Sequence, residues 1–110
     1  MTDDDLEHYV TIFRSRLRAD AGGEYEVVAA RMEARARRAP GFVDFASFAS
    51  PDGERVSIVV FDSAAHHAAW RADPEHREAQ RLGRERFYEE FDITVCRPIH
   101  RNSWRRAREG

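Results

Sequence analysis

The sequence predicts an α+β domain in which four antiparallel strands form one sheet and helices cover one of its faces. Apolar residues alternate in four separate segments, a pattern typical of β-strands. In two other regions apolar residues recur at helical spacing. Residues 50–54, Ser-Pro-Asp-Gly-Glu, form a turn signal between two of the strands, so these strands should make an antiparallel hairpin.

A strand and then a helix are predicted at the start of the chain. Residues 8–18 are rich in β-branched and aromatic side chains, so we expect the first strand there. Val10 and Ile12 would lie on one face of this strand, and the other face would carry Tyr9, Thr11, Phe13, Ser15 and Leu17. The helix ends at Pro40-Gly41, and its apolar face is indicated by Tyr25, Val28, Ala29, Met32 and Ala36.

The hairpin and a second helical region follow. Strands are predicted at residues 42–49 and 55–61, on either side of the turn. Ser63 is a candidate cap for one short helix, and Asp73-Pro74 is the start signal for a second helix through residues 75–90. The last strand is expected at residues 91–100, where Pro98 lacks an amide hydrogen and predicts a bulge or unpaired edge.

The element order β-α-β-β-α-β is that of the ferredoxin-like fold, in which both helical regions cover the same face of the sheet. The predicted strands nevertheless carry apolar residues at both sets of alternating positions, and therefore on both faces of the sheet. In the first strand the two faces carry Val10 and Ile12 against Tyr9 and Phe13. In the strand at 42–49 they carry Val43 and Phe45 against Phe42 and Phe48, and in the strand at 55–61 Val59 and Phe61 against Val56, Ile58 and Val60. A second copy stacked on the bare face would cover the exposed set, so we expect a homodimer.

Length and charge limit the possible functions. The 110 residues suit one domain, which we place at residues 6–104, with 1–5 and 105–110 as disordered tails. Basic and acidic residues number 18 and 20, a balance that predicts no nucleic-acid partner. All the basic residues are Arg, which excludes Schiff-base chemistry and any phosphate-binding loop that needs Lys.

Cysteine usage and hydropathy indicate a cytoplasmic protein without a membrane partner. Cys96 is the single cysteine, so the chain can form no internal disulfide and no thiolate cluster. No apolar segment approaches the roughly 20 residues that span a bilayer, and the acidic start differs from a signal peptide.

Candidate functional residues gather between residues 66 and 88, although familiar catalytic motifs and metal-ligand spacings are missing. His66 and His67 stand four and three residues before Trp70 and can share a helical face with it. A second, unusually polar stripe contains His76, Gln80, Gly83, Arg84 and Phe87. If both stripes face the sheet, they bound a pocket inside each subunit, with Trp70 as one wall and Phe13 and Tyr9 as the other.

Each candidate also has a structural explanation. Trp70 could be a core anchor, and His76 could merely support the cap at Asp73. Adjacent helical residues diverge by about 100°, so one of His66 and His67 should face water. Arg84 could form a surface ion pair instead of binding an anion. Gly83 within a helix suggests close approach by another element or by a ligand.

These residues form the pattern W-x5-H-x3-Q-x2-GR-x3-Y from Trp70 to Tyr88, with Phe61-Asp62-Ser63 before it and Pro40-Gly41-Phe42 before the second strand. In this pattern the chain resembles the antibiotic biosynthesis monooxygenase family over residues 8–101. The resemblance implies a ferredoxin-like fold and a homodimeric α+β barrel. It also implies one of two chemistries: oxidation of polyphenolic aromatics to quinones without metal or flavin, or binding and degradation of haem.

The sequence departs from both patterns. The His that haem-degrading members place ten residues after the Trp is here Gln80, and their Asn on the first strand falls near Arg14. His76, one turn earlier, would have to bind the iron in its place. The Asn that quinone-forming members place one turn before the Trp corresponds to His66.

We therefore expect oxidation of a planar phenolic substrate by dioxygen without a cofactor or metal. Trp70 would stack on the substrate and His66 or His76 would accept its proton. The remaining expected substrate-binding residues are Gln80, Arg84, Phe13, Tyr9 and His67. Two alternatives stay open: a haem-binding monooxygenase, and a non-catalytic dimeric protein that binds a small molecule.

Overall fold

The structure is a computed structural model that describes residues 6–107. Its elements, in chain order, are β1 (Tyr9–Leu17), α1 (Gly22–Arg38), β2 (Phe42–Ala49), β3 (Arg55–Phe61), α2 (Ala64–Ala72), α3 (Pro74–Leu82), a π-helical turn η2 (Gly83–Phe87) and β4 (Tyr88–Cys96). The predicted tail 1–5 and the last three residues of the tail 105–110 lie outside the described residues. The domain limits 6 and 104 stay a prediction.

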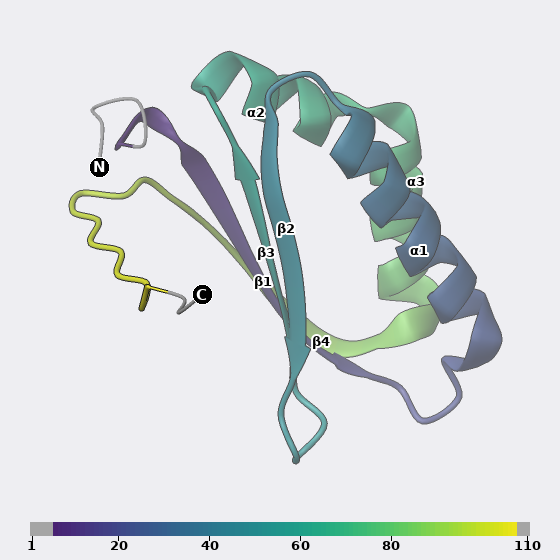
Figure 1. Cartoon of the computed structure of the whole chain (residues 1–110). Helices are drawn as coiled ribbons and strands as arrows, with labels where there is room; N and C mark the ends of the chain where they lie inside the picture. Colours follow the sequence, from purple (N-terminus) through teal and green to yellow (C-terminus); the bar gives the residue numbers. More distant parts are fainter. Residues whose placement is uncertain (1–5, 108–110) are drawn as a thin grey trace.

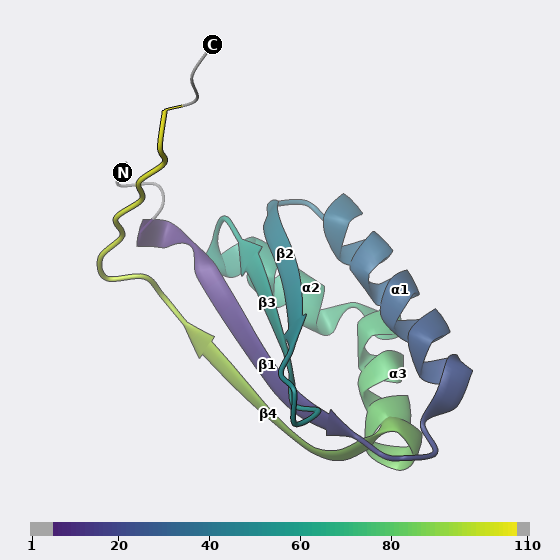
Figure 2. The ribbon, with the colours of Figure 1, turned by 60° about the horizontal axis from the view of Figure 1, so that its bottom comes forward.

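The four strands form one antiparallel sheet in the order β2-β3-β1-β4, and the helices lie together on one side of it (Figures 1 and 2). This arrangement confirms the predicted α+β class and the ferredoxin-like fold. The hairpin strands occur at the predicted residues, and Gly53 has a φ of 93° in the turn between them. No helix among residues 6–107 is long and apolar enough to cross a membrane.

Helix α1 packs with its apolar side against the π-helical turn η2. Tyr25, Val28 and Ala36 are buried, and Tyr25 packs edge-on against Phe87 with ring centroids 5.7 Å apart. Gly41 follows the helix with a φ of 81°, a conformation that favours glycine. Its carbonyl accepts a hydrogen bond from the Asp62 amide, which ties the start of β2 to the end of β3.

The predicted caps of the second helical region are confirmed. The Ser63 side chain accepts a hydrogen bond from the backbone amide of His66 at the start of α2. The Asp73 side chain accepts one from the amide of His76 at the start of α3, with Pro74 in the first turn. Two short helices therefore meet at Asp73.

The predicted helix through residue 90 is wrong beyond Leu82. Residues 83–87 form the π-helical turn, and residues 88–90 belong to β4. Gly83 permits this turn because a Cβ there would come within 2.6 Å of the Tyr88 ring. Pairing with β1 and burial of Phe87 outweigh the helix propensity of this Arg- and Glu-rich segment.

The end of the last strand also differs from the prediction. β4 ends at Cys96, not at residue 100. The register shift between β1 and β4 lies at Arg16/Leu17, opposite the beginning of β4. Of the bulge or unpaired edge expected near Pro98, no bulge occurs there in the described part of the chain, and Pro98 lies beyond the last paired residue, Cys96. The shift accompanies the early start of the strand at Tyr88, which pairs with Leu17.

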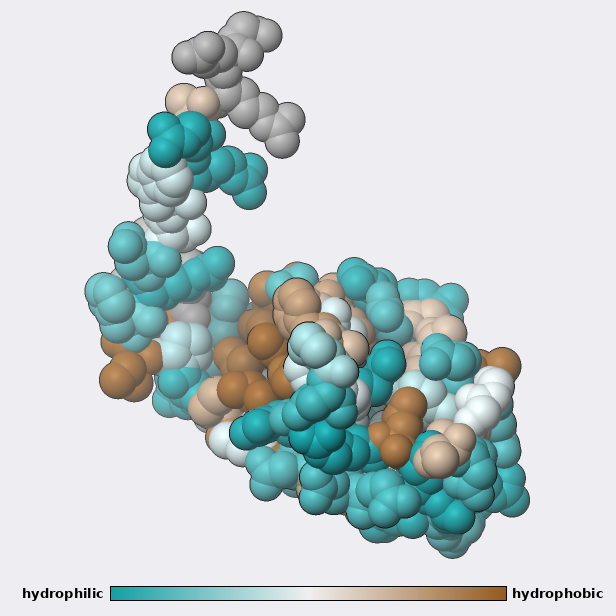
Figure 3. Space-filling view, turned by 90° about the horizontal axis from the view of Figure 1, so that it is seen from below, coloured by the Kyte–Doolittle hydropathy of each residue, from teal (hydrophilic) through white to brown (hydrophobic). Residues whose placement is uncertain are grey.

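The sheet has two apolar faces, as its strand patterns predict. Ile12 pairs with Ile58 and Val10 with Val60, so these residues share the face opposite the helices. Figure 3 shows brown, apolar surface on this side of the molecule, near the C-terminal tail. One assignment was wrong: a register shift between residues 42 and 44 places Phe42 beside Phe61 on the helix side, apart from Phe48.

We expect the bare sheet face to be buried in a homodimer. Sedimentation equilibrium at micromolar concentration should give twice the mass of the chain. Ile58→Glu, in the middle of this face, should shift the protein to monomers because a buried unpaired carboxylate is costly. Val27→Glu, at a position of α1 that is 65% exposed, should leave the dimer intact. A stable wild-type monomer would contradict the proposed assembly.

Candidate functional site

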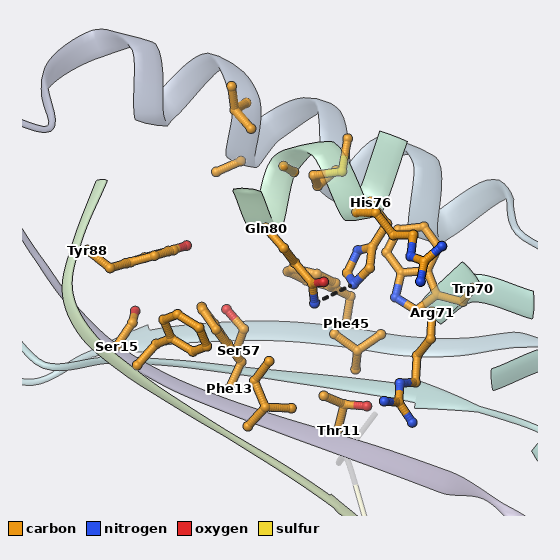
Figure 4. Close-up of a pocket in the computed structure, with 18 of the residues that line it drawn as sticks. Thr11, Phe13, Ser15, Phe45, Ser57, Trp70, Arg71, His76, Gln80 and Tyr88 are labelled. Carbon is orange, nitrogen blue, oxygen red and sulfur yellow. Dashed lines mark hydrogen bonds between the residues drawn. The ribbon is translucent and has the colours of Figure 1, made fainter. Parts of the chain in front are cut away.

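A cavity of about 540 Å³ lies between the helix-facing side of the sheet and the three helices (Figure 4). Thr11, Phe13 and Ser57 form part of its floor, and Trp70, His76 and Gln80 form part of its roof. Along β4 the cavity is bordered by Phe91, Ile93 and Val95, which are 39%, 41% and 38% exposed. The cavity therefore opens past the β4 edge of the sheet.

Trp70 and His76 are brought together by the joint between α2 and α3. Trp70 lies in the last turn of α2 and His76 in the first turn of α3. Their ring centroids are 4.5 Å apart with an interplanar angle of 47°. The indole also stacks on Phe61, with centroids 6.0 Å apart. The indole is thus fixed at the cavity wall by rings from a strand and a helix.

The imidazole of His76 is held neutral. Burial lowers the pKa of His76, and nearby Asp73 opposes this shift without overcoming it. The Nε2 atom of His76 is 3.3 Å from the amide nitrogen of Gln80, which donates toward it. Nδ1 is buried and has no hydrogen-bond partner among the described residues. A neutral ring whose Nε2 accepts a hydrogen bond is suited to receive a proton.

His67 and Thr11 form a second polar pair beside the cavity. His67 is only 4% exposed, and its Nε2 is hydrogen bonded to Thr11 Oγ1 at 2.9 Å. Its ring also stacks on Tyr9, with centroids 5.7 Å apart. Burial and the positive charge of Arg71 lower the pKa of His67. Thr11 lines the cavity, so its hydroxyl links the cavity to a buried neutral imidazole.

Four of the expected site residues lie outside the cavity lining. His67 and Tyr9 stack on each other behind Thr11, and Arg84 is exposed on the Gly83–Phe87 turn. His66 is part-exposed and its Nδ1 lies 2.7 Å from Asp62 Oδ1. Of the two adjacent histidines, His67 therefore points inward and His66 outward, as expected for helical neighbours. His66 borders a smaller hollow of about 340 Å³ on the other side of Trp70.

The expected residues that do line the cavity are Phe13, Trp70, His76 and Gln80. Tyr88 belongs to the family pattern, but no role in the site was predicted for it; Tyr88 lines the cavity, and burial raises its pKa well above the usual value. Sequence reasoning missed Arg71, because a charged residue at a helix end carries no distinguishing pattern. Thr11 and Ser15 could have been found, because they alternate with Phe13 on one strand face.

Asp73 connects the site to α1. Its Oδ1 is 2.6 Å from Arg35 on α1, while Oδ2 accepts the His76 amide at 3.0 Å. The Arg35 guanidinium holds the pKa of the Asp73 carboxyl below its usual range. No group of His, Cys, Asp and Glu side chains that could hold a metal ion occurs among residues 6–107.

Removing the Asp73 carboxylate should loosen the joint. Asp73→Ala loses the cap of α3 and the contact with Arg35, and we expect it to lower the free energy of unfolding by about 1–2 kcal/mol. Asp73→Ser should recover most of this loss because serine can cap the helix. Asp44→Ala, at an exposed strand position, is the control and should change little. Urea denaturation measures all three, and equal stability of Asp73→Ala and wild type would contradict the proposed joint.

Acid should destabilise the fold through the two inward histidines. The pKa values of His67 and His76 are lowered in the folded state, so below about pH 6.5 the unfolded chain binds more protons than the folded one. The free energy of unfolding should therefore fall as the pH drops through this range. A His67→Gln/His76→Gln double variant should flatten the profile, whereas His100→Gln, at an exposed position, should not. An unchanged slope in the double variant would contradict the interpretation.

Comparisons with known proteins agree on the fold and the family. The model of the family described as antibiotic biosynthesis monooxygenase matches residues 8–82. The chain is 30% identical over 90 residues to the uncharacterized protein YqjZ of Bacillus subtilis, covering 82% of this chain and 78% of YqjZ.

Two solved structures show the same fold. SnoaB, a cofactor-independent oxygenase from Streptomyces nogalater, superposes with a TM-score of 0.73 at 20% identity, covering 86% of this chain and 96% of SnoaB. Rv0793 from Mycobacterium tuberculosis superposes with a TM-score of 0.77 at 22% identity, covering 87% of this chain and 99% of Rv0793. The family match spans more than half of the sequence, and the chain belongs to the antibiotic biosynthesis monooxygenase family.

Proposed function

We propose that the chain is an oxygenase that oxidises a planar phenolic aromatic molecule to a quinone, with dioxygen as oxidant and without a cofactor. The observation that carries this proposal is the contact between Trp70 and His76 at the cavity wall. It places a neutral imidazole with an accepting Nε2 beside a large aromatic surface. Such a pair can both bind a flat molecule and remove a proton from it.

The shape and chemistry of the cavity support a flat aromatic substrate. Phe13, Phe45 and Trp70 line it from two strands and a helix, so rings are available on opposite sides of a bound molecule. Its volume of about 540 Å³ is in the range of pockets that bind small organic molecules. Gln80 can orient a substrate oxygen by donating its amide hydrogen, as it donates to His76.

The proposed reaction begins with proton transfer. His76 Nε2 accepts the proton of an anthrone-type substrate, and the resulting anion is a good electron donor. One electron passes from this anion to dioxygen, and the two radicals combine to a peroxide at the ring carbon. The O–O bond then breaks, one oxygen remains as the new carbonyl, and the other leaves as water with two hydrogens. Conversion of the CH₂ group to C=O supplies all four electrons that dioxygen accepts.

The apolar walls contribute by excluding water. The helix side of the cavity includes Val28 and Met32, and the sheet side includes Val59 and Ile93. Dioxygen is itself apolar, so this environment admits it, and it also strengthens the electrostatic effect of nearby charges on the substrate anion.

A solved structure with the same fold favours this chemistry over the haem alternative. SnoaB is described as a cofactor-independent oxygenase.

Oxygen consumption tests the proposal. With an anthrone as substrate, an oxygen electrode should record one dioxygen consumed per quinone formed by the wild-type protein. His76→Ala should lower kcat by about a hundredfold or more, because loss of a positioned base typically costs this much. Trp70→Phe should keep the fold but raise KM, because the ring surface shrinks and the indole N–H is lost.

His100→Ala, outside the cavity, is the matched control for removal of an imidazole. Anthrone binding without oxygen uptake would identify the chain as a non-catalytic binding protein. Loss of activity in His66→Ala together with full activity in His76→Ala would contradict the assignment and identify His66, on the other side of Trp70, as the base.

A further inference from the structure

The charged residues that line the cavity are all basic. Among the described residues that border it are Arg55, Arg71 and Arg77, whereas none is Asp or Glu. A lining with basic residues alone is not expected by chance, because acidic residues outnumber basic ones in the sequence, 20 to 18. A cavity with cations and without carboxylates has a positive potential that attracts anions.

Arg71 is the arginine best placed to act on a ligand. Its side chain leaves α2 next to Trp70 and extends toward Thr11 on the sheet floor (Figure 4). No carboxylate of residues 6–107 lies within ion-pair distance of it, whereas Arg35, outside this cavity, contacts both Asp73 and Glu75. Arg55 is already engaged, with its guanidinium 5.6 Å from the centroid of the Tyr25 ring. Arg71 thus presents an uncompensated positive charge.

Thr11 provides a second donor at the same end of the cavity. Its Oγ1 is 2.9 Å from Nε2 of His67. When the neutral His67 carries its proton on Nε2 and donates it to Oγ1, the Thr11 hydroxyl hydrogen is left to donate to a ligand. A guanidinium and a hydroxyl donor side by side match the two oxygens of a carboxylate.

We propose that the substrate is an aromatic carboxylic acid whose carboxylate binds Arg71 and Thr11 while its rings lie along Trp70 and Phe13. This inference rests on the proposed function for the aromatic part of the molecule and adds the anionic group. Arg71 is then a specificity-determining residue, distinct from the proton acceptor His76. The carboxylate end fixes how far the rings reach along the cavity and so which ring carbon meets His76 Nε2.

Calorimetric titration of the full-length protein with anthracene carboxylate and the matching neutral carboxamide tests this directly. We expect the carboxylate to bind wild type about tenfold to a hundredfold more tightly, the range typical of a charge-assisted hydrogen bond. Added salt should reduce the difference. Arg71→Gln should abolish the preference, and Arg71→Lys should restore part of it. Arg31→Gln, which removes an exposed charge from α1, should retain the preference in full.

Equal affinity of wild type for the two compounds would overturn the proposal, and this result does not depend on any variant folding. A preference that survives Arg71→Gln but disappears in Arg77→Gln would overturn the assignment to Arg71. The oxygen electrode separates this inference from the proposed function. Carboxylate preference without oxygen uptake would retain the anion site and reject the oxygenase. Oxygen uptake with equal kcat/KM for an anthrone and its carboxylate would retain the oxygenase and reject the anion site.

Discussion

The carboxylate of Asp73 is the interaction on which the site depends. One of its oxygens caps α3 through the His76 amide and the other contacts Arg35 on α1. The carboxylate thereby fixes the angle between two short helices and joins both to the longest one. Neither short helix, nine residues each, would be stable alone in water, so their positions are set by this joint and by packing. The contact between Trp70 and His76 is a direct result.

Burial then decides the chemistry of the two inward histidines. Both imidazoles are neutral because a charged ring would lose its hydration in the cavity wall. The hydrogen bonds they make are few, and Nδ1 of His76 has none to the residues that the structure describes. An incompletely paired buried polar group costs free energy. Such groups are common where a protein keeps a side chain ready for a ligand instead of for its own stability.

Local signals in the sequence were sufficient for most of the fold and for part of the site. Ser63, Asp73 and the turn at residues 50–54 act on their immediate neighbours, so their effects could be predicted without knowledge of the rest of the chain. The structure of segment 83–90 could not be predicted in this way, because pairing with β1 and the fit of Tyr88 against Gly83 outweigh the helix propensity of its residues. The places of Arg71 and Tyr88 in the cavity lining could not be predicted for the same reason: they arise from what the sheet places opposite these residues.

The cavity opens along one edge of the sheet. β4 is an edge strand, and its apolar residues Phe91, Ile93 and Val95 are both part of the cavity border and part of that edge. Exposed apolar edges are the places where sheets of different molecules join and aggregate. Glu90 and Asp92 alternate with these residues and are exposed on the same strand, and Glu90 forms an ion pair with Arg16 of β1 at 3.2 Å. Charged side chains on an edge strand oppose edge-to-edge pairing with another sheet. The edge of the strand thus stays accessible to a small molecule, while edge-to-edge pairing of β4 with another sheet is opposed.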